Sequence, residues 1–203
     1  MLRRLPPIAL ALACAPLAGA AATVDVVVSG ADGRPLADAV IFLEPRDGRP
    51  LAPKPAAGVE IEQAGKQFTQ RVTVVPVGSE VAFPNRDKVR HHVYSFSPIK
   101  PFELKLYIGT PANPVRFDKA GIAVLGCNIH DRMAAWVVVA DTPWFARSGG
   151  DDVARIDDAP AGAYRLASWH PGLPANSAPL VQNLQLGGGE QRETVQLAVD
   201  AAP

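Results

Sequence analysis

Residues 126–133 read GCNIHDRM, and this short segment decides how the rest of the chain is interpreted. It places a cysteine, a histidine and a methionine at the spacing C-x-x-H-x-x-M, between β-prone runs at 122–125 and 134–140. Two adjacent histidines, His91 and His92, stand upstream beside another β-prone run. Cysteine, histidine and methionine side chains are soft or borderline metal ligands, so the segment predicts a metal site.

Copper explains why these residue types occur together. A thiolate and two imidazoles in a trigonal plane, with a weak thioether on the axis, bind both Cu(I) and Cu(II) with little rearrangement. One tight loop can supply Cys127, His130 and Met133, and a neighbouring strand can supply the fourth ligand. Zinc fits less well because a thioether is not a usual zinc ligand, and haem attachment would require the motif C-x-x-C-H.

The cysteine count depends on the first residues of the chain. Two arginines precede an apolar run at 5–17 and small residues at 18–20, which predicts a Sec-type signal peptide over residues 1–22. Cleavage is expected after Ala20 or Ala22, and the apolar run is too short to span a bilayer. Removal of Cys14 would leave Cys127 as the one thiol in an oxidising periplasm. Such a cysteine needs a reason: an intermolecular bridge, a reactive thiol or a metal.

The composition predicts an all-β protein. The 203 residues are 48 % hydrophobic, and 20 prolines and 17 glycines separate short valine-rich runs. The formal net charge is zero, which gives no electrostatic footprint for nucleic acid or for an anionic membrane. We expect a sandwich or barrel over 23–143, followed by a small β-module at 150–203.

The segment FPNRDKVRHHV at 83–93 resembles the one that delivers the first histidine ligand in small blue copper proteins. The loop that contains Cys127 resembles the short ligand loop of amicyanin. The range 58–141 therefore resembles a plastocyanin- or amicyanin-type cupredoxin, which implies a Greek-key β-sandwich. The wider chain, including NIHD at 128–131 and WHP at 169–171, resembles periplasmic proteins labelled "methylamine utilization protein". This is a genome-neighbourhood label that shows no role in methylamine oxidation. The tail more weakly resembles carboxypeptidase-regulatory-like modules.

The resemblance implies one copper per chain, with His91, Cys127, His130 and Met133 as ligands. Cupredoxins usually have asparagine after the first histidine, where it ties the two ligand loops together, but this chain has His92. Neighbouring residues on a strand point to opposite faces, so one of the two histidines can bind. His91 is favoured because it falls six residues after the asparagine of the segment, in the register of the resembling proteins.

The resemblance implies a periplasmic electron carrier rather than an enzyme. The edge of His130 would exchange electrons, and Ile129 would contribute to a docking patch for a c-type cytochrome or a dehydrogenase. Two alternatives remain open. The same ligands could serve a copper carrier or sensor, and the tail could indicate a structural β-sandwich module without metal. His170 is expected to be structural, with its imidazole bonded to a nearby carbonyl group.

Overall fold

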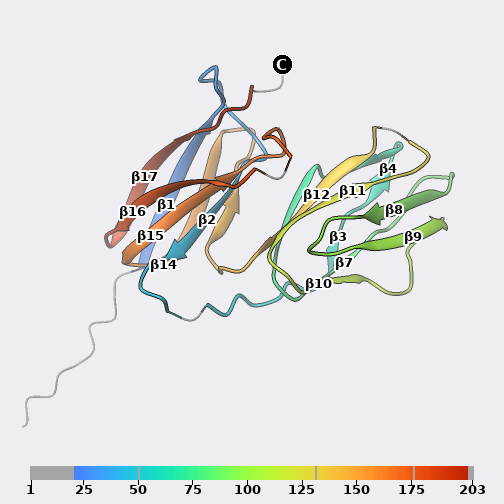
Figure 1. The fold of residues 1–203 in the computed structure, drawn as a ribbon, viewed down its shortest axis with the longest axis horizontal. Coiled ribbons are helices and arrows are strands. Elements are labelled where there is room, and N and C mark those ends of the chain that lie inside the picture. The colour runs from blue at the N-terminus through green and yellow to red at the C-terminus, as the bar shows by residue number, and fades with distance from the viewer. Residues whose placement is uncertain (1–20, 50, 131, 176, 201–203) are drawn as a thin grey trace, which may run out of the picture.

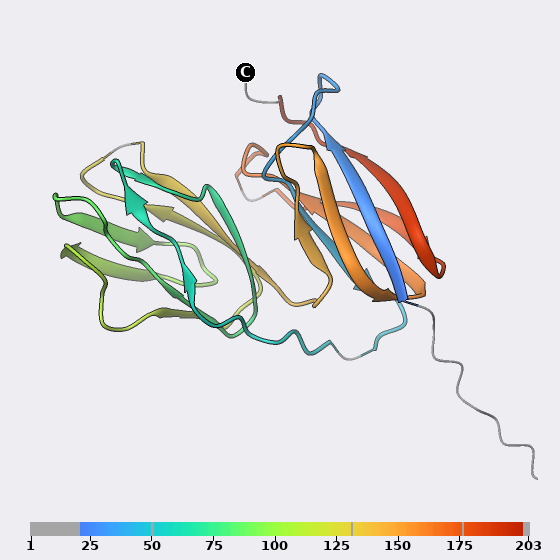
Figure 2. The same cartoon turned by 180° about the vertical axis from the view of Figure 1, so that it is seen from behind.

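The computed structural model describes residues 21–49, 51–130, 132–175 and 177–200, and every regular element in these ranges is a β-strand. The prediction of an all-β fold is therefore confirmed. The strands form two lobes that lie side by side (Figure 1). We call them the central lobe, built from β3 to β12, and the terminal lobe, built from β1, β2 and β13 to β17. The view from behind shows the same two lobes (Figure 2).

The central lobe is a sandwich of two sheets with a short hairpin. The larger sheet has the order β6-β12-β11-β8-β9, the smaller one has the order β10-β7-β3, and β4 pairs with β5. Apolar side chains from both sheets, Val81 and Leu125 among them, form one buried core. The strands are β3 (Val59–Glu60), β4 (Gln63–Ala64), β5 (Gln67–Phe68), β6 (Val72–Pro76), β7 (Ser79–Ala82), β8 (His91–Ser95), β9 (Phe102–Tyr107), β10 (Val115–Phe117), β11 (Gly121–Gly126) and β12 (Ala134–Ala140).

The terminal lobe is a second sandwich, with sheets β14-β1-β17 and β13-β2-β15-β16. In β1, alternate residues such as Val24, Val26 and Val28 are buried in the core, as expected for a strand with one face turned inward. β1 runs parallel to β17 and antiparallel to β14. The strands are β1 (Ala21–Ser29), β2 (Val40–Pro45), β13 (Phe145–Arg147), β14 (Val153–Pro160), β15 (Gly162–Trp169), β16 (Leu180–Leu186) and β17 (Gly189–Gln196).

The strand pairing differs from the expected division of the chain. We expected 23–143 to form one unit and 150–203 a separate small module. In the structure, β1 and β2 pair with strands of the tail, and the central lobe lies between them in the sequence. Alternation of apolar and polar residues identifies β1 as a strand, but it does not identify the strand that pairs with it. The partner β17 lies more than one hundred residues away in the sequence.

The chain leaves the terminal lobe after β2 and returns to it beside the same strand. The backbone N–H of Leu43 donates to the carbonyl of Trp144 at 2.9 Å, and the buried hydroxyl of Thr142 donates to the carbonyl of Leu43 at 2.7 Å. The two lobes share a small apolar cluster of buried side chains, which is made by Val40, Val72, Val138 and Trp169. The segment through which the chain leaves the terminal lobe and the segment through which it returns are therefore held next to one another.

The expected signal peptide lies outside the described residues, except for its last two positions. Ala21 and Ala22 belong to β1, and Ala22 is buried opposite Ala159. Cleavage after Ala20 would leave β1 whole, whereas cleavage after Ala22 would remove its first two residues. Among the described residues, no helix has the length and apolar character that crossing a membrane requires.

Candidate metal centre

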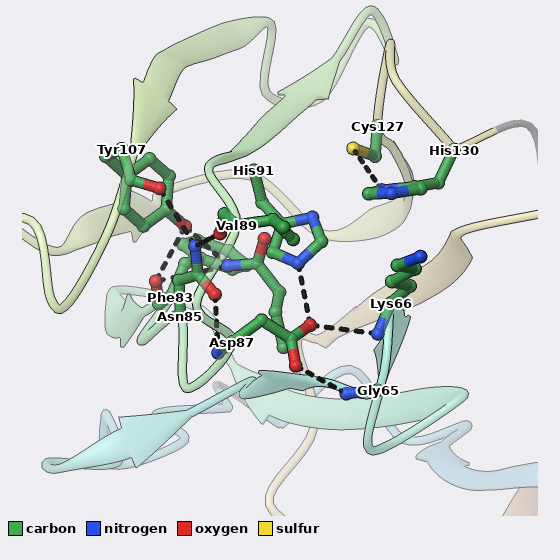
Figure 3. A network of polar contacts seen from close by, with 11 residues as sticks. Gly65, Lys66, Phe83, Asn85, Asp87, Val89, His91, Tyr107, Cys127 and His130 are labelled. Atoms are coloured by element: carbon green, nitrogen blue, oxygen red, sulfur yellow. Dashed lines mark hydrogen bonds and ion pairs between the residues drawn. The ribbon is translucent and has the colours of Figure 1, made fainter.

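Three of the four expected ligands meet at one end of the central lobe. Donor atoms of His91, Cys127 and His130 all lie within 4.8 Å of one another. The Sγ of Cys127 is 3.9 Å from Nδ1 of His130, and the rings of His91 and His130 are 4.9 Å apart between centroids. The His91 ring lies beside the other two side chains (Figure 3). Residues 36 positions apart in the sequence thus form one cluster.

Strand pairing explains how this cluster forms. His91 is the first residue of β8, Cys127 directly follows β11, and His130 lies in the turn before β12. β8 and β11 are neighbours in the large sheet, where Gly126 pairs with Tyr94. A side chain at the start of one strand is thereby held close to one at the end of the next, as expected for antiparallel neighbours.

Asp87 holds His91 from the side opposite the cluster. Its carboxylate accepts backbone hydrogen bonds from Gly65 at 2.8 Å and Lys66 at 2.9 Å, and its Oδ2 lies 2.8 Å from Nε2 of His91 (Figure 3). The Lys66 N–H and then the His91 ring keep the pKa of the Asp87 carboxyl below its ordinary value. Because an ionised carboxylate can only accept, Nε2 of His91 is the donor, and in the neutral ring this leaves the lone pair on Nδ1.

That lone pair is the observation that fits a metal. His91 is fully buried, and its Nδ1 has no hydrogen-bond partner among the described residues. Cys127 is a buried free thiol. In a trigonal site with metal–sulfur and metal–nitrogen bonds of about 2.3 and 2.0 Å, donor atoms lie roughly 3.7 Å apart. The measured separation of 3.9 Å between Cys127 and His130 is close to this value.

Met133 lies in the same part of the lobe. It is 3 % exposed and belongs to the apolar cluster that contains Cys127. Both residues also line one surface hollow beside Tyr94 and Phe96. The donor set of one thiol, two imidazoles and one nearby thioether is the set that copper prefers. The assignment of the four residues as ligands remains a prediction, and their placement is compatible with it.

His92 also has a buried Nδ1 without a hydrogen-bond partner among the described residues, so its position distinguishes it from His91. Its Nε2 lies 2.9 Å from Oε1 of Glu103, and it lines a small hollow with Asn128 and Ile129 of the ligand loop. The cluster of donor atoms includes His91 and does not include His92. Of the two alternatives left by the sequence, the geometry favours His91.

A polar network braces the loop that carries Asp87. The amide of Asn85 donates to the carbonyls of Val89 at 2.9 Å and Tyr107 at 2.8 Å, and its oxygen accepts from the backbone of Asp87. The Tyr107 hydroxyl donates to the carbonyl of Phe83 at 2.6 Å (Figure 3). Burial raises the pKa of Tyr107 to about 12, so this hydroxyl keeps its proton. The loop before His91 is therefore tied at both ends.

His170 lies far from the cluster, in the terminal lobe. Its Nε2 donates to the carbonyl of Ala37 at 3.1 Å, and its Nδ1 accepts from the backbone of Gly172 at 2.9 Å. Burial, and then the nearby Arg71, lower the pKa of His170, while Asp38 acts in the opposite direction. The expected hydrogen bond to a carbonyl group is therefore present, and the structural role of His170 stays a prediction.

Sequence reasoning did not single out Asp87, although it quoted the segment that contains it. The available signal was a carboxylate four residues before a candidate histidine ligand. Metal-binding histidines commonly donate their second ring nitrogen to such a group. The hydrogen bonds that the backbone N–H groups of Gly65 and Lys66 donate to Asp87 could not be predicted from the sequence, because almost every residue has a backbone N–H.

No protein-family model matches the sequence, and no curated protein matches it. Among solved structures, the chain is similar to a mutant of amicyanin in its Cu(I) state, with 19 % identity and a TM-score of 0.37, covering 49 % of this chain and 98 % of that one. A purple cupredoxin from Nitrosopumilus maritimus shows 19 % identity and a TM-score of 0.36 over 40 % and 99 % of the two chains. A copper-containing nitrite reductase from Thermus scotoductus shows 25 % identity and a TM-score of 0.39, and the match covers 49 % of this chain and 27 % of the reductase. The residues of the site, rather than these partial likenesses, carry the functional conclusion.

Proposed function

We propose that the central lobe is a cupredoxin-type domain that binds one copper ion and carries electrons in the periplasm. Its ligands would be His91, Cys127, His130 and Met133, and the protein would act as a carrier rather than as an enzyme. The observation that carries this proposal is the fully buried His91, whose Nδ1 has no hydrogen-bond partner among the described residues and which stands within 4.8 Å of a free cysteine and a second histidine.

Bound copper would supply a one-electron Cu(II)/Cu(I) couple. The protein's contribution is to keep the donor atoms nearly fixed in both oxidation states. Asp87 fixes the tautomer and orientation of His91, and the paired strands β8 and β11 fix the spacing between His91 and Cys127. Cys127 and Met133 are buried, although both also line a surface hollow, so little of either side chain contacts water. His130 is half-buried, so one ring edge is available for electron exchange.

We also propose that this domain is inserted into the terminal lobe, between β2 and β13. The support is the pairing of Phe42 in β2 with Phe145 in β13, which brings together the two chain segments that flank the central lobe. The terminal lobe would then act as a platform that carries the copper domain.

Addition of Cu(II) to the purified protein tests the proposal. We expect an intense absorption band at about 600 nm, which is the thiolate-to-copper charge transfer expected for this ligand set. The band should disappear in Cys127→Ser and His91→Gln, while His92→Gln is the matched control and should keep it. A colourless copper-loaded protein, or equal copper binding by Cys127→Ser, would contradict the proposal.

A copper carrier or sensor would use the same ligands, so colour does not distinguish it. The reduced copper protein should be oxidised rapidly by a c-type cytochrome if it is an electron carrier. Tight binding of copper without such an exchange would favour the carrier or sensor. Absence of copper from protein isolated from the periplasm would favour a structural module.

A further inference from the structure

Charge is unevenly distributed between the two lobes, although the whole chain is neutral. Residues 59–140 contain 10 cationic residues (Lys and Arg) and 7 anionic residues (Asp and Glu). Residues 21–58 and 141–203 together contain 8 cationic and 13 anionic residues. The terminal lobe also neutralises its cations locally, because five of its arginines make ion pairs with carboxylates. The central lobe therefore carries the positive side of the molecule.

Five of the central-lobe cations lie on segments that carry or adjoin the candidate metal centre. All five are exposed, and none makes an ion pair with a carboxylate of the described residues: Lys66, Lys88, Arg90, Lys105 and Arg132. We call them the cationic rim. They come from the turn that binds Asp87, from the loop before His91, from β9 and from the ligand loop.

The carboxylates of the same face are fewer and are mostly engaged. Asp87 is bound to His91 and to two backbone N–H groups, and Glu103 lies against His92. Asp131 lies outside the described residues. The segments around the candidate metal centre thus carry five cations and at most three anions, so the electrostatic potential of this face is positive.

Exposed apolar side chains lie on or next to the segments that carry the cationic rim. Val89 is 43 % exposed, Leu106 51 %, Ile108 58 % and Ile129 47 %. Ile129 of the ligand loop lines one hollow together with Leu106 and Lys105 of β9. The bridge between Asn85 and Gly109 holds the end of β9 against the loop that carries Val89. An apolar centre with a charged border is the usual anatomy of a protein–protein interface.

From this arrangement we infer that the face around His130 docks an electron-transfer protein whose own exchange edge is ringed by carboxylates. The redox nature of the partner rests on the proposed function, whereas its acidity rests on the cationic rim. Carboxylates of the partner would face the five cations, and apolar groups would meet Ile129 and Leu106. Complementary charges of this kind raise association rates by roughly 10-fold to 1,000-fold at low salt.

A titration of the copper-free protein with poly-L-glutamate tests the acidity of the partner without any electron transfer. We expect amide chemical-shift changes at residues 65–66, 88–90, 105–108 and 129–132 at low salt, and their loss at about 0.5 M NaCl, where screening is nearly complete beyond roughly 4 Å. Changes that are absent, or that occur mainly in the terminal lobe, would overturn the inference.

Charge-reversal variants give the matched comparison. Lys88→Glu with Lys105→Glu changes the rim, and Arg46→Glu with Arg192→Glu changes the net charge equally on exposed sites of the terminal lobe. The rim variant should lose the shift changes, and the control variant should keep them. Equal behaviour of the two variants would show that net charge, and not the rim, determines the binding.

Ferricyanide oxidation of the reduced copper protein tests the same surface during electron transfer. One electron passes from the reduced centre to ferricyanide, which becomes ferrocyanide. Without residues 1–20 the chain has 18 cationic and 20 anionic side chains, so its net charge would repel this anion. A positive local face instead predicts that the rate falls about threefold or more from 10 to 300 mM salt. A rate that rises with salt would overturn the inference, whereas a missing 600 nm band would count against the proposed function.

Discussion

Replacing Asp87 by alanine removes the group that orients His91. The substitution deletes the acceptor for two backbone N–H groups and for Nε2 of His91. Gly65 and Lys66 are exposed, so water can replace the lost acceptor at those two positions. His91 is fully buried, so its Nε2 is left without a partner.

The expected cost follows from this difference in burial. A buried donor without a partner costs about 1–3 kcal/mol, and hydrogen bonds to a charged group contribute about 1.5–3 kcal/mol each before water replaces them. We expect the free energy of unfolding of the copper-free protein to fall by about 2–4 kcal/mol. For a chain of this size the melting temperature should fall by roughly 5–15 °C. Copper affinity should fall by about 10-fold to 100-fold, since Asp87 supports a ligand without touching the metal.

Urea denaturation of the copper-free protein and a competitive copper titration measure the two effects. Asp118→Ala is the matched control, because Asp118 makes one ion pair, with Arg116, on the exposed surface. That pair should contribute less than about 1 kcal/mol. If Asp87→Ala costs no more than Asp118→Ala and leaves copper affinity unchanged, then Asp87 does not hold His91 in the way described.

Three further predictions concern packing, pH and domain organisation. Gly126→Ala would place a Cβ 2.6 Å from Cζ of Tyr94, so we expect a loss of about 1–3 kcal/mol in urea denaturation, and a much smaller loss when Tyr94→Ala is also present. The lowered pKa of His170 means that the unfolded chain takes up a proton before the folded protein does as the pH falls below about 6.5. Stability should be full above that pH and decrease below it, and His170→Gln should flatten this dependence between about pH 7.5 and 5.5. Replacement of residues 46–141 by a two-residue Asn-Gly turn should leave a terminal lobe that unfolds cooperatively on heating; a chain without a cooperative transition would contradict the proposed insertion.

The sequence was most informative where the chemistry is local. Cys127, His130 and Met133 lie within seven residues, so their spacing indicated a shared site before any fold was known. The choice of His91 needed the register of a resembling segment, because residues 36 positions apart are brought together by the pairing of β8 with β11. The role of Asp87 depends on backbone donors of a distant turn, and no pattern in the sequence marks those donors.

The arrangement of the lobes was less predictable for the same reason. In β14, charged residues occupy the exposed face and Asp158 has a positive φ of 57°, so the sequence of this strand does not alternate regularly. The partners of β1 lie at the other end of the chain, so a reading of neighbouring segments assigned β1 to the central lobe. Strand identity is a local property, whereas strand pairing is a property of the whole fold.

The parallel pairing of β1 with β17 also bears on the order of folding during synthesis. β1 lies between β14 and β17, so both of its hydrogen-bonding edges stay open until β14 has been made, and the edge that pairs with β17 stays open until the last strand of the terminal lobe has been made. The central lobe contains all of its own strands by Ala140, and it can close while the terminal lobe is still unpaired. A strand rich in valine with two open edges is prone to pair with other chains. The pairing of β1 on both edges is therefore completed only after every strand of the central lobe has been made.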